Sequence, residues 1–508
     1  MRPADRRLIG LILLMLAVYA VLWAAGAFPE PESAPHSGPE LIAGTPEAGG
    51  YVGFAPPIVA VLPFAALLLS IALLPLLQPT AEWWGHTRNQ FLLALVLSAA
   101  TLFYYGTMHP GGLENHFTHQ GATSPGWETV TAALSNALLS EYVPFIVLLL
   151  GLYVASGGVF LAGNLAAHPA ANSALLGVGA VLASIIGTTG AAMILIRPLL
   201  RANQERRHKS HTVVFFIFVV CNCGGLLLPT GDPPLFLGYL RGVPFTWTLG
   251  LWPYWLGVNM VLIGVYYLWE RRLYRQEKPE AIRGDQTQAT ALRLEGGLNL
   301  LWMVAIVAAV AVVVPGEPLP GTALVVPPFL REAVLLLLTL LSLTVSDPAA
   351  RSENRFTYHA IGEVAALFSG IFICMQVPVE ILNARGAALG LSSPMSFFWA
   401  TGTLSSFLDN APTYVVFLEL GAASLPAQAV DVVALAGSRA ISDAHLTAVS
   451  LGAVFMGAMT YVGNGPNFMV RSIAHHAGVD MPSFFRYMLF SGLVLLPIFA
   501  VVAFALRG

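Results

Sequence analysis

A carboxylate and an amide lie side by side inside an apolar stretch, SSFLDNAPTYVVFLEL, at positions 405–420. A carboxylate placed in hydrocarbon costs free energy unless a cation, a proton or hydrogen-bond donors compensate its charge. Asp409 is therefore predicted to hold a cation or, in its absence, a proton, with oxygen ligands from Asn410 and Thr413. The alternative is that Asp409 caps a helix that begins near Pro412.

A second acidic residue, Asp232, lies in PTGDPP at 229–234, and a similar run, VGNGPN, lies at 462–467. Gly and Pro interrupt a membrane helix and leave carbonyl and N–H groups unpaired, which is tolerated only where protein, water or an ion satisfies them. Free carbonyls at such a break can bind sodium, and the positive ends of half-helices suit anions. Asp232 is predicted as a ligand or as a helix cap.

The predicted cation- and proton-binding residues share a place at a hairpin tip or a helix break, and they are Asp409, Asn410, Asp232, Thr188, Thr189, Thr413, Gly231, Gly463 and Asn464. Sodium is predicted at Asp409, Asn410 and Asn464. Glu141 and Glu363 lie in long apolar segments, where a proton pathway and a structural polar pairing are equally consistent with the sequence.

These groups must be positioned by membrane helices. Of the 508 residues, 56% are hydrophobic and 10% are charged, against about 25% charged in soluble domains. The sequence contains no polar block large enough for a soluble domain, no spaced cysteine framework and no nucleotide-binding or hydrolase motif. It therefore predicts a non-enzymatic, all-α polytopic membrane protein without cofactors, surrounded by the lipid bilayer and binding no nucleic acid.

Hydropathy predicts eleven transmembrane helices and two re-entrant hairpins, at 172–200 and 393–423, each interrupted at its middle by GTTG or DNAP. With the N-terminus cytoplasmic and both hairpins returning to their side of entry, most of the 24 Lys and Arg residues fall on internal loops. The protein is thus predicted as multi-pass in the cell membrane, specifically an inner membrane. The predicted spans are 8–27, 56–78, 91–107, 131–160, 212–240, 246–269, 299–315, 332–346, 360–382, 445–470 and 484–506.

The two halves, 1–269 and 299–508, are separated by a charged segment, 270–298, predicted to be a cytoplasmic linker. Three features recur in the same order in each half. A glutamate in a long helix and a hairpin tip are followed by a broken helix, 212–240 in the first half and 445–470 in the second. Since the predicted topology runs in opposite directions through them, the sequence predicts an inverted repeat, which is typical of secondary transporters with a site near the membrane midplane.

The polar hairpin tips and the PTGDPP and VGNGPN breaks resemble those of the ion transporter superfamily that includes NhaD-type sodium/proton antiporters, ArsB-type arsenite carriers, citrate carriers and dicarboxylate symporters. The similarity extends over nearly the whole chain. It implies a homodimer in which a scaffold holds a mobile transport domain that moves as an elevator. The dicarboxylate branch has neutral Ser-Asn-Thr tips, whereas this chain has an acidic tip at Asp409.

Two functions follow from these residues. The first is a sodium/proton antiporter, in which sodium and a proton compete for Asp409 and Asp232. The alternative is a sodium- or proton-coupled symporter of citrate or another carboxylate, with sodium at the hairpin and break clusters and the carboxylate between them. Neither hairpin tip has an arginine that could bind the carboxylate. In both, sodium and protons act as coupling ions and no bound cofactor is needed.

Overall fold

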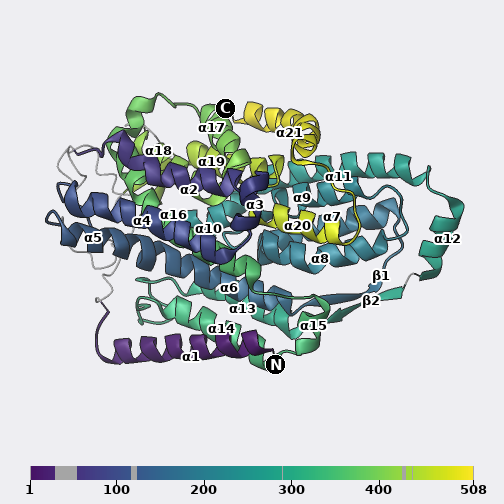
Figure 1. Cartoon of the computed structure of the whole chain (residues 1–508), viewed down its shortest axis with the longest axis horizontal. Helices are drawn as coiled ribbons and strands as arrows, with labels where there is room; N and C mark the ends of the chain where they lie inside the picture. The colour runs from purple at the N-terminus through teal and green to yellow at the C-terminus, as the bar shows by residue number, and fades with distance from the viewer. Residues whose placement is uncertain are drawn as a thin grey trace.

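The computed structural model describes residues 2–28, 54–115, 123–288, 290–425, 431–436 and 439–506, and it is mostly helical (Figure 1). Among these residues, seven helices are long and apolar enough to cross a bilayer, or eight if one bent pair counts as a single span. This agrees with a polytopic membrane protein. The eleven crossings, the inverted repeat and the elevator motion stay predictions.

The helical elements up to residue 274 are α1 (Pro3–Ala24), η1 (Ile58–Val61), α2 (Leu62–Leu73), α3 (Gln78–Trp84), α4 (Thr87–Thr107), α5 (Trp127–Leu134), η2 (Ser135–Tyr142), α6 (Val143–Gly157), α7 (Pro169–Ile186), α8 (Thr188–Ala202), α9 (Ser210–Val219), η3 (Cys223–Leu226), α10 (Pro233–Leu240), η4 (Trp247–Leu251) and α11 (Trp252–Tyr274). Those that follow are α12 (Pro279–Gln288), α13 (Leu298–Val312), α14 (Leu330–Val345), α15 (Pro348–Glu353), α16 (His359–Arg385), η5 (Gly386–Leu389), α17 (Pro394–Phe407), α18 (Asn410–Ala423), α19 (Asp443–Met456), η6 (Gly457–Met459), α20 (Gly465–His476) and α21 (Phe484–Ala505).

Several predicted spans differ in detail from the helices observed. The span predicted at 56–78 ends earlier, because η1 and α2 meet α3 at a bend of 103°. α13 and α14 have 15 and 16 residues, fewer than the roughly 20 that span a bilayer without thinning it. In contrast, α5, η2 and α6 form one helical segment of 31 residues whose middle, η2, is a π-helix.

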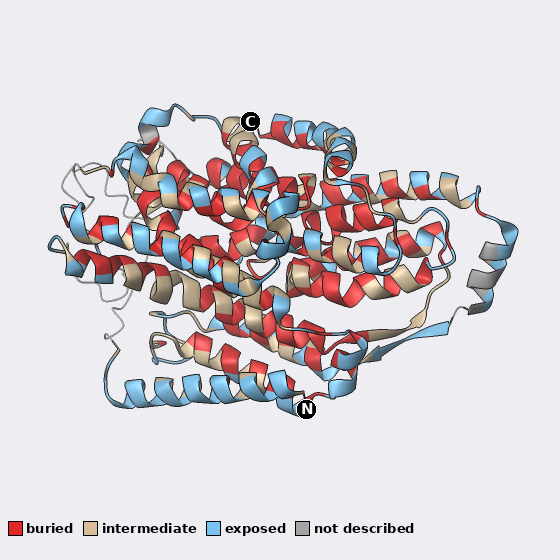
Figure 2. Cartoon of the chain, viewed as in Figure 1, coloured by how far each residue is buried: buried red, intermediate tan, exposed pale blue. Residues whose placement is uncertain are grey.

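The two interrupted helices form the centre of the molecule. Every residue from His211 to Val219 in α9 and from His445 to Met456 in α19 is buried. A helix that is apolar all round needs neighbours on every side. α1 shows the opposite pattern, since it runs along the outside next to α14 and exposes most of its apolar side chains, as a helix facing lipid would (Figure 2).

The segment predicted as a solvated linker, 270–298, is more ordered than its charge suggests. It contains the end of α11, the helix α12 and a strand, β2 (Thr290–Glu295), which pairs antiparallel with β1 (Phe160–Asn164). Ladder hydrogen bonds to β1 satisfy the backbone of β2 even though most of its residues are exposed. A second hairpin of β3 (Val432–Leu435) and β4 (Arg439–Ser442) lies between α18 and α19.

Candidate functional site

The first predicted hairpin consists of α7 and α8, which fold back on each other at Gly187. This glycine has φ +85°, a conformation that side chains with a Cβ rarely adopt. At the open end of the hairpin, the side chains of Asn172 and Asn203 exchange two hydrogen bonds of 2.9 and 3.1 Å. The tip of the hairpin contacts the first break, because the N–H of Thr188 donates to the carbonyl of Gly231 at 2.8 Å.

The second predicted hairpin consists of α17 and α18, joined through Leu408 and Asp409. Both residues have extended backbone conformations, so the two helices are separated by a short extended break. Near the open end, the rings of Phe397 in α17 and Phe417 in α18 lie 6.4 Å apart in an edge-on contact. The two helices therefore fold back on each other, as the predicted hairpin requires.

The two broken helices have matching backbone conformations. Asp232 occupies the N-cap position of α10 with φ −143° and ψ 143°, and Asn464 occupies that of α20 with φ −153° and ψ 138°, and neither side chain makes a capping hydrogen bond. In each break a pair of glycines six positions apart lies in close contact. A Cβ on Gly231 would clash with the carbonyl oxygen of Gly225, and a Cβ on Gly463 would lie 2.6 Å from that of Gly457. Glycine is needed at both breaks because the backbone passes so close to itself.

Asp232 lies where both hairpin tips and both breaks meet. Its Oδ1 accepts hydrogen bonds from Thr188 Oγ1 and from Asn464 Nδ2, each at 3.0 Å. Its Oδ2 accepts from Asn410 Nδ2 at 2.7 Å. The carboxylate is 2% exposed, and all three partners donate to it, as they would to an ionised carboxylate. One buried carboxylate thus connects the two halves of the chain.

An asparagine network extends this centre across the breaks. Asn222 Nδ2 donates to Asn467 Oδ1 at 2.8 Å, and Asn464 Nδ2 also reaches the carbonyl of Cys221 at 3.0 Å. Asn467 Nδ2 in turn donates to the carbonyl of Gly457 at 2.8 Å. Carbonyls left free by the breaks are therefore satisfied by side-chain amides, as the bilayer interior requires.

Two features of the centre suit an ion. Asn410 is fully buried, and among the described residues its Oδ1 has no hydrogen-bond partner, although its Nδ2 donates to Asp232. An unpaired buried oxygen costs free energy, which a bound cation would recover. In addition, α8 and α18 begin at residues that donate to Asp232, α20 begins next to one, and α10 begins next to Asp232 itself, and helix N-termini favour negative charge.

The other predicted residues lie close to this centre with different roles. Asp409 is half-buried and accepts a hydrogen bond from the N–H of Ala411 at 3.1 Å, so it caps α18. Thr413 Oγ1 donates to the Asp409 carbonyl at 2.9 Å, inside the same helix turn. Thr189 is half-buried, and no side-chain hydrogen bond is found for it within the described ranges.

The two glutamates predicted as a matching pair have different surroundings. Glu141 lies in the π-helix η2 and accepts from Arg241 Nη2 at 2.8 Å. Glu363 lies in α16, where its side chain is 33% exposed and accepts from Gln90 Nε2 at 2.9 Å, with His359 3.5 Å away. Only Glu141 belongs to a buried ion-pair network.

Sequence reasoning missed that network. Arg241 lies in the short connection between two predicted spans, where a charged residue is expected to be solvated. It is 6% exposed, and its Nε donates to Glu419 Oε1 at 3.1 Å. Glu419 is 1% exposed and sits in the apolar part of α18, where an intramembrane acid could have been taken as a signal.

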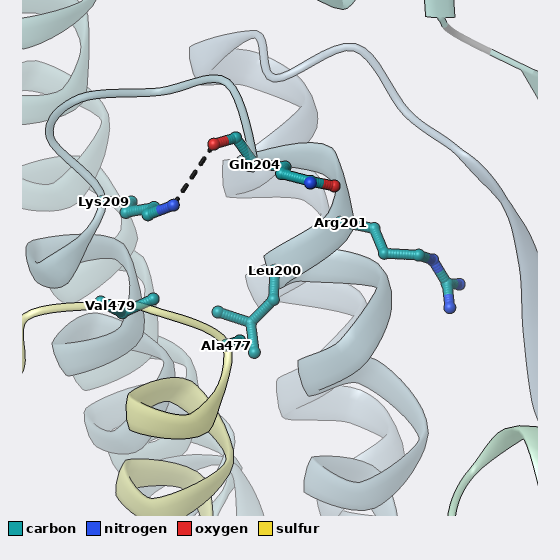
Figure 3. Close-up of a pocket in the computed structure, with 6 residues that line it drawn as sticks. All are labelled: Leu200, Arg201, Gln204, Lys209, Ala477 and Val479. Carbon is teal, nitrogen blue, oxygen red and sulfur yellow. Dashed lines mark hydrogen bonds between the residues drawn. The ribbon is translucent and has the colours of Figure 1, made fainter.

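One cavity lies away from this centre. It measures about 230 Å³ and lies between the end of α8 and the connection from α20 to α21 (Figure 3). Lys209 Nζ donates to the carbonyl of Gln204 at 3.3 Å, while Arg201 turns away and donates to the carbonyl of Leu161. The two cations do not converge, so this cavity is no counterpart of the Asp232 centre.

Comparison with known proteins gives a family. No curated protein matches the chain. The model of a family described as "Putative citrate transport" matches residues 54–506, which include both hairpins, both breaks and Asp232. The match covers most of the chain, and it agrees with the multi-pass helical fold. The protein therefore belongs to this putative citrate transport family of membrane transporters.

Proposed function

We propose that the protein is a secondary active transporter whose coupling ion binds at Asp232, and that it exchanges sodium for protons. The observation that carries this proposal is the buried Asp232 carboxylate, which accepts hydrogen bonds from Thr188, Asn410 and Asn464. These donors come from both hairpin tips and from the second break. Since Asp232 itself lies in the first break, a change in its charge acts on both hairpin tips and both breaks at once.

The chemistry follows from competition for one carboxylate. Burial disfavours an uncompensated charge, so Asp232 needs a proton or a cation whenever its donors do not suffice. Sodium at Asp232 would gain the unpaired Oδ1 of Asn410 as an oxygen ligand and would displace the proton. If the site opens to one face at a time, each sodium carried one way requires protons carried the other way.

Asp409 has a secondary role in this proposal. As the cap of α18 it fixes the first turn of the helix, and this turn carries Asn410. The sequence pointed to Asp409 as the coupling acid. The hydrogen bonds support Asp232 instead, because three side chains donate to it, whereas Asp409 accepts from the backbone N–H of Ala411.

A second candidate is the sodium- or proton-coupled transport of citrate or another carboxylate. The family description and the four helix N-termini around the centre favour an anion. Since Asp232 would repel that anion, one or more cations would have to bind first. In either case we propose a homodimer in the cell membrane with a cytoplasmic N-terminus, in which the two opposed repeats form an elevator.

Flux measurements on the purified protein in vesicles with a trapped pH dye separate the two candidates. External sodium or lithium without citrate is expected to make the lumen more alkaline, because protons leave as the cation enters. Choline at equal ionic strength is the control. If proton movement and labelled citrate uptake appear only when citrate is present with a cation, the symporter replaces the antiporter.

A further inference from the structure

The short helix α10 and the hairpin helix α18 pack against each other and are bonded at both ends. At their N-terminal ends, Asn410 Nδ2 donates to Asp232 Oδ2 at 2.7 Å. At their C-terminal ends, Arg241 Nε donates to Glu419 Oε1 at 3.1 Å. Each helix separates its two bonded residues by nine positions, 232 to 241 and 410 to 419, or about 13.5 Å of helix rise. The helices are therefore parallel and in register.

Close packing fills the space between the two bonds. A Cβ on Gly238 of α10 would collide with the hydroxyl of Tyr414 of α18, so only glycine allows this approach. Tyr414 is 1% exposed. Since neither helix can slide past the other without breaking this contact, a displacement at one end of the pair is transmitted to the other end.

The C-terminal bond belongs to a larger network that anchors the pair. Arg241 Nη2 also donates to Glu141 Oε1 at 2.8 Å, and Arg439 pairs with the second oxygen of Glu419. The network thus links α10 and α18 to η2 and β4, with two positive and two negative groups. Removing one member of a buried ion pair leaves its partner uncompensated, so each member matters more than an exposed charge would.

We propose that Arg241 and Glu419 are positioning residues for the coupling site: their ion pair sets the distance between Asp232 and Asn410 at the far end of the same two helices. Glu141 is then a counter-ion of Arg241 rather than a proton carrier. What the site does rests on the proposed function, whereas the coupling between the two ends of the helix pair does not.

The first test compares two charge-neutralising variants at buried Arg–Glu pairs. Glu419→Gln weakens the C-terminal bond, and Glu332→Gln is the matched control, because Glu332 pairs with Arg331 at 2.7 Å in α14 with both side chains 5% exposed. Loss of one charged hydrogen bond changes an equilibrium constant about tenfold. Glu419→Gln is therefore expected to raise the half-saturating sodium concentration about tenfold, with little change in maximal rate. Glu332→Gln is expected to leave it unchanged. A wild-type sodium dependence in Glu419→Gln would overturn the proposal.

The second test needs no transport. Thr413, one turn from Asn410, is 4% exposed, and a cysteine placed there is expected to react slowly with a maleimide. The three native cysteines are buried and give the background rate. Adding Glu419→Gln is expected to speed labelling of Thr413→Cys about tenfold, and Glu332→Gln to leave it unchanged.

The two tests fail independently. If Glu419→Gln speeds the labelling of Thr413→Cys but the wild-type protein shows no sodium-driven flux, the antiporter is refuted and the positioning role stands. Unchanged labelling would refute the positioning role whatever the flux. Arg241→Lys serves as the conservative variant, because an ammonium keeps the charge but cannot present the same fork to Glu141 and Glu419. It is expected to lie between the wild type and Glu419→Gln in both measurements.

Discussion

The break between α9 and α10 and the break between α19 and α20 differ in the residue just before the second helix, which is Asp232 in the first and Asn464 in the second. The hairpin tips differ in the opposite sense, since the residue before the second helix is Gly187 in the first hairpin and Asp409 in the second. Each half thus contributes one acid, but at different places. The acid at the break is buried among three side-chain donors, whereas the acid at the tip caps a helix.

Similar backbones can therefore hold side chains of unequal charge. Both breaks need a close pair of glycines, and each has a polar residue at the N-cap position of the second helix. The side chain of Asn464 donates a hydrogen bond to that of Asp232. Only one of these two residues is charged, so a cation at the proposed site would be compensated by the first half and coordinated mainly by neutral groups of the second. The coupling charge is predicted to lie in the first half of the chain.

The largest expected effect comes from neutralising the buried acid. Asp232→Asn keeps the size of the side chain and removes its charge, so we expect sodium-driven proton movement to fall at least about 100-fold in vesicles. Asp409→Asn, which can still cap α18, is expected to lose less than about tenfold. The reverse order of these two variants would restore Asp409 as the coupling acid and reject Asp232.

A smaller effect is expected when the charge is moved to the other break. Asn464→Asp alone places a second carboxylate about 3 Å from Asp232, so like-charge repulsion should lower the thermal stability and the flux together. Combining it with Asp232→Asn leaves one acid at the corresponding position. We expect this double variant to recover about a tenth of the wild-type rate, well above Asp232→Asn alone. If it stays inactive with a normal melting temperature, the two positions are not interchangeable.

Local sequence signals identified the tips and breaks because Gly, Pro and polar residues are conspicuous in apolar segments. GTTG, DNAP, PTGDPP and VGNGPN all lie at interruptions between helices. The ranking of Asp409 above Asp232 could not be decided this way, since it depends on which side chains meet after folding. Arg241 and Glu419 were missed for the same reason: their pairing joins residues 178 positions apart. The strand within 270–298 could not be predicted either, because β2 is stabilised by pairing with β1, which is distant in the sequence.

The glycine pairs offer a comparison in which the two breaks should behave alike. Gly231→Ala and Gly463→Ala each push a Cβ into a backbone carbonyl, which we expect to destabilise the protein by about 1–3 kcal/mol. Gly257→Ala in α11 is the control, since a Cβ there meets nothing within 4 Å. Thermal unfolding in detergent measures the difference. A strong effect at one break alone would show that the backbones are less similar than their dihedral angles indicate.

The smallest effect is expected at the acidic tip when its capping function is kept. Asp409→Ser retains an oxygen that can accept from the N–H of Ala411, so α18 should still begin at Asn410. The flux should then stay within about twofold of the wild type, while Asp409→Ala should lose about 1 kcal/mol of stability with the cap. A serine variant that is stable but inactive would mean that the charge of Asp409 is needed in addition to its cap. The coupling charge would then be shared between the hairpin tip of the second half and the break of the first.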